Sequence, residues 1–241
     1  AAGQYKTITT ILGGEWKEST TNAIGQLIIA KDAGGELNYT YNSQGLLKSV
    51  SLDGTNVSTM DYDPITGYQT ALTEPNSGTT SYLYNGFGEL KQQIMSGATT
   101  TLAYDVLGRI ITRTDPDGIF TYSYVPTGNG KNQLLNIKKN GIIDQDFTYD
   151  TWHRPISANQ RIDGIGYTTS LEYNTYNDVT KIIYPQSFAV DYQYNADGFL
   201  QKILRGGTST IIYQTNTANK LGQITNYKLG NNPTSSITYQ A

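Results

Sequence analysis

A tyrosine followed at once by Asp or Asn, with Gly three residues further on, recurs along this 241-residue chain and constrains its fold more than any other feature. The clearest copies are YNSQG at 41, YNGFG at 84, YDVLG at 104 and YNADG at 194. Looser copies begin at 62, 149 and 173, TNAIG at 21 lacks only the Tyr, and two longer, irregular units begin at 124 and 213. These ten anchor positions lie 19 to 25 residues apart, so a repeat of about 20 residues fills nearly the whole chain.

The residues around each anchor predict a β-hairpin. Two positions before the Tyr stands an apolar or aromatic residue, and three positions before it a polar one, as in Tyr39 and Asn38 before Tyr41. This period of two indicates a strand. The Asp or Asn and the Gly that follow match a type I turn whose last residue has positive φ. We therefore expect an all-β fold of tandem antiparallel hairpins in one continuous twisted, spiralling sheet, with residues 1–241 forming a single region of about ten units.

The repeat gives its residues structural roles. The predicted repeat tyrosines are Tyr41, Tyr62, Tyr84, Tyr104, Tyr124, Tyr149, Tyr173, Tyr194, Tyr213 and Tyr239. The predicted positive-φ turn residues are Gly45, Gly88, Gly108, His153, Asn177 and Gly198. His and Asn are among the non-glycine residues that tolerate positive φ, so replacing either by Gly should be neutral or slightly stabilising.

Composition excludes several classes of site. The absence of Cys excludes thiol catalysis, disulfides and Cys-based zinc sites, and a single His excludes a histidine-rich metal centre. A net charge of −3 with 15% charged residues argues against a nucleic-acid surface. No apolar run approaches the length of a membrane span. The sequence therefore predicts no catalytic residue, metal or cofactor, no nucleic-acid partner and no membrane span.

Three local patterns allow a second interpretation. His153 lies near Asp150 and Ser157, which permits a triad, but the repeat places His153 at the turn Gly position. The stretch DPDG at 115–118 is interpreted as an ordinary turn between two strands. The tyrosine rows are interpreted as cross-strand packing, while stacking on sugar rings stays open as an alternative.

The pattern Y-[DN]-x-x-G-x-[LI], followed by a second turn and repeated about every 20 residues, closely resembles the YD-repeat or Rhs repeat family, and YDVLGRI at 104–110 is nearly its consensus. Known relatives include bacterial Rhs polymorphic toxins, B and C subunits of insecticidal toxin complexes, wall-associated proteins and teneurins. The resemblance implies an antiparallel sheet that spirals into a hollow shell, which in the bacterial toxins encloses an effector polypeptide. The family's shell-closing segment with paired DPxG motifs is not recognisable in this chain.

The expected function is that of a non-catalytic shell segment in a secreted or cell-surface protein, with bacterial export. Its expected partners are the remainder of its own polypeptide and an enclosed effector. The alternative is an extracellular adhesion or carbohydrate-binding module that binds cell-surface glycans or proteins through exposed tyrosines. Residues 236–239 repeat the approach to an anchor Tyr, so we expect a fragment of a longer protein, an arc of wall whose edge strands self-associate.

Overall fold

The structure is a computed structural model that describes residues 3–10, 16–230 and 233–239. In those residues every regular element is a strand except one short 3-10 helix, η1 (Pro185–Ser187). The chain divides into two compact units, residues 1–119 and 120–241. Each unit is a run of antiparallel hairpins, so the predicted all-β fold is confirmed.

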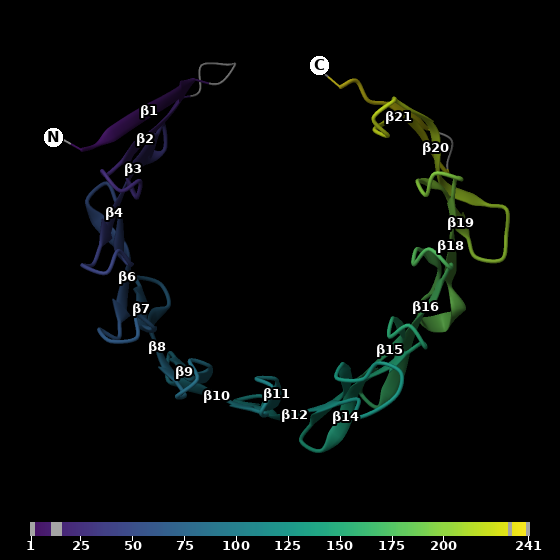
Figure 1. Cartoon of the computed structure of the whole chain (residues 1–241), viewed down its shortest axis with the longest axis horizontal. Helices are drawn as coiled ribbons and strands as arrows, with labels where there is room; N and C mark the ends of the chain where they lie inside the picture. The colour runs from purple at the N-terminus through teal and green to yellow at the C-terminus, as the bar shows by residue number, and fades with distance from the viewer. Residues whose placement is uncertain (1–2, 11–15, 231–232, 240–241) are drawn as a thin grey trace. The chain divides into compact units, whose positions relative to one another are not determined.

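In the first unit, each strand from β1 to β10 pairs antiparallel with the strand that follows it in the chain (Figure 1). Its strands are β1 (Tyr5–Thr10), β2 (Trp16–Thr21), β3 (Leu27–Asp32), β4 (Gly35–Tyr41), β5 (Leu47–Leu52), β6 (Thr55–Tyr62), β7 (Gln69–Glu74), β8 (Gly78–Tyr84), β9 (Leu90–Met95), β10 (Ala98–Tyr104) and β11 (Ile110–Asp115).

The second unit continues the same pattern. Its strands are β12 (Gly118–Tyr124), whose first two residues belong to the first unit, β13 (Leu134–Lys139), β14 (Ile142–Tyr149), β15 (Pro155–Ile162), β16 (Ile165–Tyr173), β17 (Val179–Ile183), β18 (Ala189–Tyr194), β19 (Leu200–Arg205), β20 (Ile211–Ala218), β21 (Ile224–Leu229) and β22 (Thr234–Ser236).

Side-chain hydrogen bonds explain why the anchor turns form. In eight of the described turns, the Asp or Asn side chain accepts hydrogen bonds from the backbone N–H groups two and four residues on. Asn42, for example, accepts from Gln44 and Leu46, each at 2.9 Å. We call these the Asx turns. They join the two strands of each repeat at one end of the strands, and shorter polar turns join successive repeats at the other end. Each of these two rows of turns is called an edge of the sheet below.

A β-bulge precedes every Asx turn. The register between the two strands shifts at the anchor residue in all ten described anchor hairpins, which are the eight with Asx turns and the two at Tyr62 and Tyr124. Between β10 and β11, for example, Ala103 pairs with Thr112 but Tyr104 pairs with Ile110, which leaves Ile111 as the extra residue. A bulge bends its strand and increases the local right-handed twist. The bulges therefore provide the twist that the sequence predicted, by a means that the sequence did not reveal.

The structure corrects the anchor of the tenth repeat. The repeat spacing predicts this anchor at Tyr213, with an irregular turn after it. The bulge instead lies between Thr217 and Ala218, and the Asx turn runs from Asn219 to Gly222, whose N–H donates to the Asn219 carbonyl at 3.0 Å. Ala218 therefore occupies the anchor position, because ANKLGQI matches the repeat in everything except the tyrosine.

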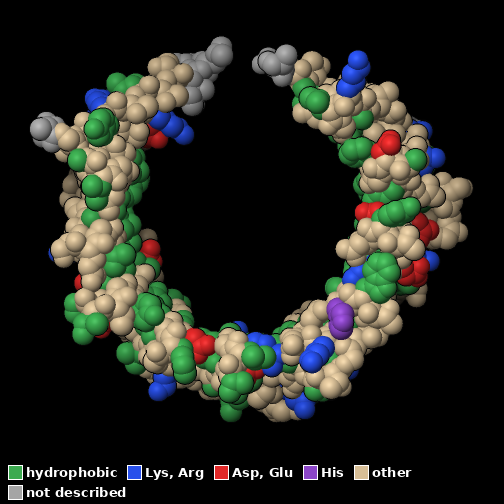
Figure 2. Space-filling model, viewed as in Figure 1, with side chains coloured by type: hydrophobic (Ala, Val, Ile, Leu, Met, Phe, Trp, Pro, Cys, Tyr) green, Lys and Arg blue, Asp and Glu red, His purple; other side chains and the backbone are tan. Residues whose placement is uncertain are grey.

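The sheets bury few residues completely. Among the described residues, Val190 is the one buried hydrophobic residue, and Thr20 and Thr80 are the buried polar residues. The chain exposes 15955 Å², whereas a globular monomer of this mass exposes about 10,700 Å². Figure 2 shows hydrophobic side chains spread along both units rather than gathered in one patch. Both faces of these single-layer sheets therefore remain at least partly exposed.

Candidate functional site

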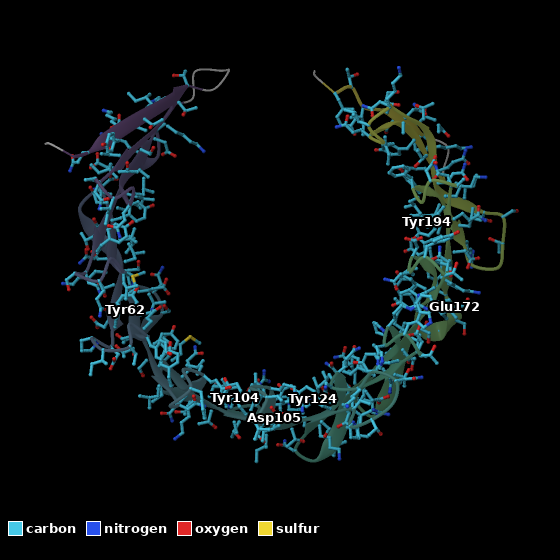
Figure 3. The ribbon with its side chains drawn as sticks, viewed as in Figure 1. Tyr62, Tyr104, Asp105, Tyr124, Glu172 and Tyr194 are labelled. Carbon is cyan, nitrogen blue, oxygen red and sulfur yellow. The ribbon has the colours of Figure 1, made fainter. Side chains whose placement is uncertain are left out.

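The repeat tyrosines form a ladder of hydrogen bonds between neighbouring repeats. In seven of the described repeats, the tyrosine hydroxyl donates to the backbone carbonyl of the residue that begins the second strand of the preceding repeat. The pairs are Tyr41–Leu27 (2.7 Å), Tyr62–Leu47 (2.7 Å), Tyr104–Leu90 (2.8 Å), Tyr149–Leu134 (2.7 Å), Tyr173–Pro155 (2.8 Å), Tyr194–Val179 (2.8 Å) and Tyr239–Ile224 (3.1 Å). Figure 3 labels Tyr62 and Tyr104 in the first unit and Tyr194 in the second.

Burial raises the pKa of several of these hydroxyls. Desolvation is the main cause at Tyr62, Tyr104, Tyr149, Tyr173 and Tyr194. A raised pKa keeps the hydroxyl protonated, which is the form that donates to a carbonyl. The ladder therefore gives these tyrosines a structural role, in line with the packing interpretation.

Tyr84 makes a different contact. Its ring lies 5.0 Å from the ring of Tyr68, at a tilt of 39°. Tyr68 also lies against Gly88, where an added Cβ would stand 2.3 Å from the Tyr68 hydroxyl. Gly88 has φ of 84°, so both its conformation and its surroundings favour glycine.

The tenth repeat lacks its tyrosine but keeps a hydroxyl on the same carbonyl. The Thr215 hydroxyl donates to the Leu200 carbonyl at 3.1 Å. The Tyr213 hydroxyl in turn lies 3.1 Å from the Thr215 hydroxyl, and the Tyr213 ring stacks on Tyr227 at 5.6 Å. Tyr213 therefore supports a substitute for the anchor tyrosine and does not itself reach the preceding repeat.

The Asx turns are also linked to one another. The Gln26 amide donates to the Gly45 carbonyl at 2.9 Å, and the Gln44 amide donates to the Pro64 carbonyl at 2.8 Å. In the second unit the Gln133 amide donates to the His153 carbonyl at 2.6 Å. In these three cases a glutamine side chain in or beside one turn donates a hydrogen bond to the backbone of the next turn, which links the turns of adjacent repeats.

The predicted turn residues adopt left-handed backbone conformations. The φ angles of the glycines are 80° at Gly45, 84° at Gly88, 75° at Gly108 and 83° at Gly198, and those of their substitutes are 63° at His153 and 75° at Asn177. These values match the type I turn with a left-handed last residue.

His153 does more than replace glycine. Its Nδ1 accepts a hydrogen bond from the backbone N–H of Gly130 at 2.8 Å. Gly130 is buried in the long loop after β12, where an added Cβ would lie 2.3 Å from the Tyr149 ring. Glycine at residue 153 would leave this N–H without its acceptor, so the structure leads us to expect that His153→Gly is destabilising rather than neutral.

The possible triad is not assembled. The Asp150 carboxylate accepts from the N–H groups of Trp152 and Arg154 and from Arg154 Nε, the last at 2.7 Å, and so turns toward the guanidinium. Burial opposes ionisation of Asp150, but the hydrogen bonds from Arg154 outweigh it and lower the pKa. The imidazole of His153 faces Gly130 instead.

The DPDG stretch is a turn, as the sequence predicted. Asp115 ends β11 and accepts a hydrogen bond from the N–H of Asp117 at 2.9 Å, while Gly118 begins β12 at φ of 137°. Arg113 forms an ion pair with Asp115 at 2.9 Å. These contacts account for both acidic residues as parts of the turn.

A row of exposed apolar side chains lies at the tips of the Asx turns, at the third turn residue. Each of these side chains is at least 60% exposed: Ile24, Ile65, Phe87 and Leu107 in the first unit, and Trp152, Tyr176 and Leu221 in the second. We call them the tip residues. The opposite turns, such as Asp53-Gly54 and Ser96-Gly97, are polar themselves, but exposed apolar side chains such as Ile142 (75%) and Ile165 (60%) flank turns of that kind. Sequence reasoning missed the tip residues, although their spacing from the anchor tyrosine was visible.

The described part of the chain offers no group of three or more His, Asp or Glu side chains that could hold a metal ion. Within the same residues, no helix has the length and hydropathy needed to cross a membrane.

Comparison with known proteins supports the predicted resemblance. The model of the RHS repeat matches residues 95–119, which contain YDVLG. The fold matches the crystal structures of TcdB2–TccC3–TEV (TM-score 0.76, 16% identity) and of TcdB2–TccC3 without its hypervariable C-terminal region (0.72, 15%). It also matches a mutant of the Photorhabdus luminescens Tc holotoxin pore (0.70, 15%). Each match covers 94% of this chain but 13% of the other. No curated protein matches the sequence. The chain thus carries an RHS repeat and has the fold of a portion of these toxin chains.

Proposed function

We propose that this chain is a non-catalytic structural segment of an Rhs-type shell, which encloses or scaffolds a toxin or effector polypeptide in a secreted or exported protein. The observation that carries the proposal is the ladder itself. The hydroxyls of Tyr62, Tyr104 and Tyr194 each donate a hydrogen bond to a backbone carbonyl of the preceding repeat. Such hydrogen bonds hold successive hairpins together in a sheet, and they do not arrange side chains around a reacting group.

The exposed surface supports a role within a larger assembly. The sheets bury little on either face, and the tip residues place large apolar side chains such as Phe87 (90% exposed) along one edge. We propose that these side chains contact other polypeptide in the larger assembly. The proposed partners are the remainder of a longer polypeptide along the edges and an enclosed effector on one face.

The likeness to TcdB2–TccC3 chains supports the same role. The likeness covers nearly the whole of this chain and a small share of the TcdB2–TccC3 chains, as expected for a segment of a larger shell. Secretion or export follows from the role, because a toxin shell acts outside the cell that makes it.

Site-specific cross-linking in the exported protein tests the proposal. A photoreactive phenylalanine analogue replaces Leu83, which is 57% exposed on β8, or its neighbour Tyr82, whose side chain points to the other face of the strand. We expect one of the two positions to cross-link to effector sequence encoded by the same gene, and the other to give no such product. Cross-links from neither position, or equal cross-links from both faces to target-cell components, would overturn the shell role.

Adhesion or carbohydrate binding is the second candidate, and the aromatic tip residues favour it. Trp152 is 60% exposed and Tyr176 is 86% exposed, and such rings stack on sugars. A glycan array with the wild type and with Trp152→Ala and Tyr176→Ala separates the two functions. Binding that both variants lose supports the second candidate, whereas a shell segment binds no glycan.

A further inference from the structure

The tenth repeat has Ala218 at the anchor position, where the repeats on either side have the rings of Tyr194 and Tyr239. In the repeat before it, Tyr194 pairs across the hairpin with Leu200, and its hydroxyl reaches back to the carbonyl of Val179. The ring therefore spans the space between the first residues of two successive returning strands. Ala218 has the same place in its hairpin, opposite Ile224, but its methyl group cannot span that space.

A cavity of about 250 Å³ lies at this position. Its apolar lining comes from Phe199, Leu200, Ala218 and Ile224, with Gly222 at one side. The Phe199 ring lies 3.2 Å from where a Cβ on Gly222 would stand, so this wall is closely packed. An enclosed apolar cavity of about 150 Å³ binds benzene in another protein. The pocket at Ala218 is half open, and by volume it accommodates one six-membered ring.

The polar groups of the cavity favour a neutral occupant. Among the described residues that line it, none carries a charge; the polar ones are Asn195, Gln201, Thr215, Asn216 and Thr217. Thr215 already donates to the Leu200 carbonyl, so a ring without a hydroxyl leaves no acceptor unsatisfied there. A carbonyl oxygen has two lone pairs, so a phenolic hydroxyl is also compatible with the site.

We propose that the cavity at Ala218 is a binding site for one neutral aromatic ring of phenyl or phenol size. The ring takes the place that the repeat tyrosine occupies elsewhere in the chain. Two sources supply this chemistry: a free small aromatic molecule, and a Phe or Tyr side chain of a polypeptide. The inference does not depend on the proposed shell function, because it rests only on the missing ring and the cavity it leaves.

Titration of the full chain with p-cresol, the side-chain analogue of tyrosine, tests the site. Saturation-transfer NMR and calorimetry should show one bound p-cresol per chain, and 4-methylcyclohexanol, which has a similar size but no planar ring, should bind at least tenfold more weakly. The tripeptide acetyl-Gly-Tyr-Gly-amide distinguishes the sources. Its binding at the same site admits a polypeptide side chain, and binding of p-cresol alone assigns the site to free small aromatics.

Two substitutions locate the site. Ala218→Tyr supplies the missing ring and should abolish p-cresol binding while raising the melting temperature. Ala103→Tyr adds the same ring on an exposed position of β10 and should leave binding unchanged. Tyr194→Ala opens an equivalent gap one repeat earlier and should raise the stoichiometry from one to two. The proposal is overturned if the wild type binds no p-cresol at millimolar concentration, or if Ala218→Tyr binds it as well as the wild type; the Ala218→Tyr result stands even where Tyr194→Ala does not fold.

Discussion

Replacing His153 by glycine separates what the repeat pattern requires from what this particular histidine contributes. Residue 153 has φ of 63°, which glycine adopts freely, so the pattern alone favours the change. The structure adds the hydrogen bond from the buried Gly130 N–H to the imidazole, a bond that glycine cannot make. Asn177→Gly is the matched control, because φ at Asn177 is 75° and its side chain accepts one long bond, at 3.3 Å, from Arg154.

The magnitude follows from three contributions. Relief of the left-handed backbone of a non-glycine residue stabilises the fold by about 1 kcal/mol. The added freedom of glycine in the unfolded chain offsets most of this, at about 0.4 to 1 kcal/mol. These two contributions apply to both variants and nearly cancel. The buried N–H left without an acceptor costs a further amount of about 1 to 3 kcal/mol in His153→Gly alone. We therefore expect His153→Gly to be about 1 to 3 kcal/mol less stable than Asn177→Gly.

Urea unfolding followed by tryptophan fluorescence measures this difference. The chain has two tryptophans, Trp16 in the first unit and Trp152 beside the substituted residue, so a Trp16→Phe background makes the signal specific to the second unit. The unfolding midpoint should fall for His153→Gly and stay close to the parent value for Asn177→Gly, with the slope unchanged. Equal midpoints for the two variants would refute the argument, since the imidazole would then contribute nothing beyond its backbone conformation.

Three further outcomes are expected. Tyr104→Phe removes a ladder hydrogen bond and should cost about 1 kcal/mol, measured by urea unfolding, whereas Tyr176→Phe, at 86% exposure, should cost almost nothing. Gly88→Ala should destabilise more than Gly54→Ala: φ is 84° and 85°, so strain is equal, but a Cβ collides with a tyrosine ring only at Gly88; equal melting temperatures would contradict this. In a pH series of thermal melts, stability should fall at both extremes. Burial raises the pKa of Tyr104, so its contribution is full below the ordinary value of 10.0 and is lost as pH rises through the folded value. The Arg109 hydrogen bond lowers the pKa of Asp105, so that contribution is present above 3.8 and is lost as pH falls through the folded value; a flat profile at both ends would contradict both assignments.

Local chemistry explains what the sequence predicted correctly. The Asx turns need only an Asp or Asn side chain and a residue that accepts positive φ, both within one short stretch, so their positions and the hairpin fold follow from spacing. The substitutes at residues 153 and 177 follow for the same reason. The anchor at Ala218 was missed because the search began from tyrosine, although the turn residues Asn219 and Gly222 carry the pattern in full.

Contacts between repeats explain what the sequence did not predict. The bond between Gly130 and His153 joins residues 23 apart, and no local pattern indicates it. The same holds for the bulge at each anchor, which depends on the register of two strands rather than on residue type. The tip residues are apolar residues in a polar stretch of sequence only in part (Val106 precedes Leu107), so their exposure became clear only when the turn geometry was known.

The tyrosine ladder has a direction, and this has a consequence for how the chain acquires its structure. Each hydroxyl reaches back to a carbonyl of the preceding repeat, 14 to 18 residues earlier in the chain. A repeat emerging from a ribosome or an export channel therefore finds its acceptor already in place, and it needs no residue that has yet to appear. Contacts of such short sequence separation close quickly. Folding can thus proceed as the chain emerges, one hairpin at a time from the amino terminus. At each stage, one unpaired strand is exposed at the growing end of the sheet.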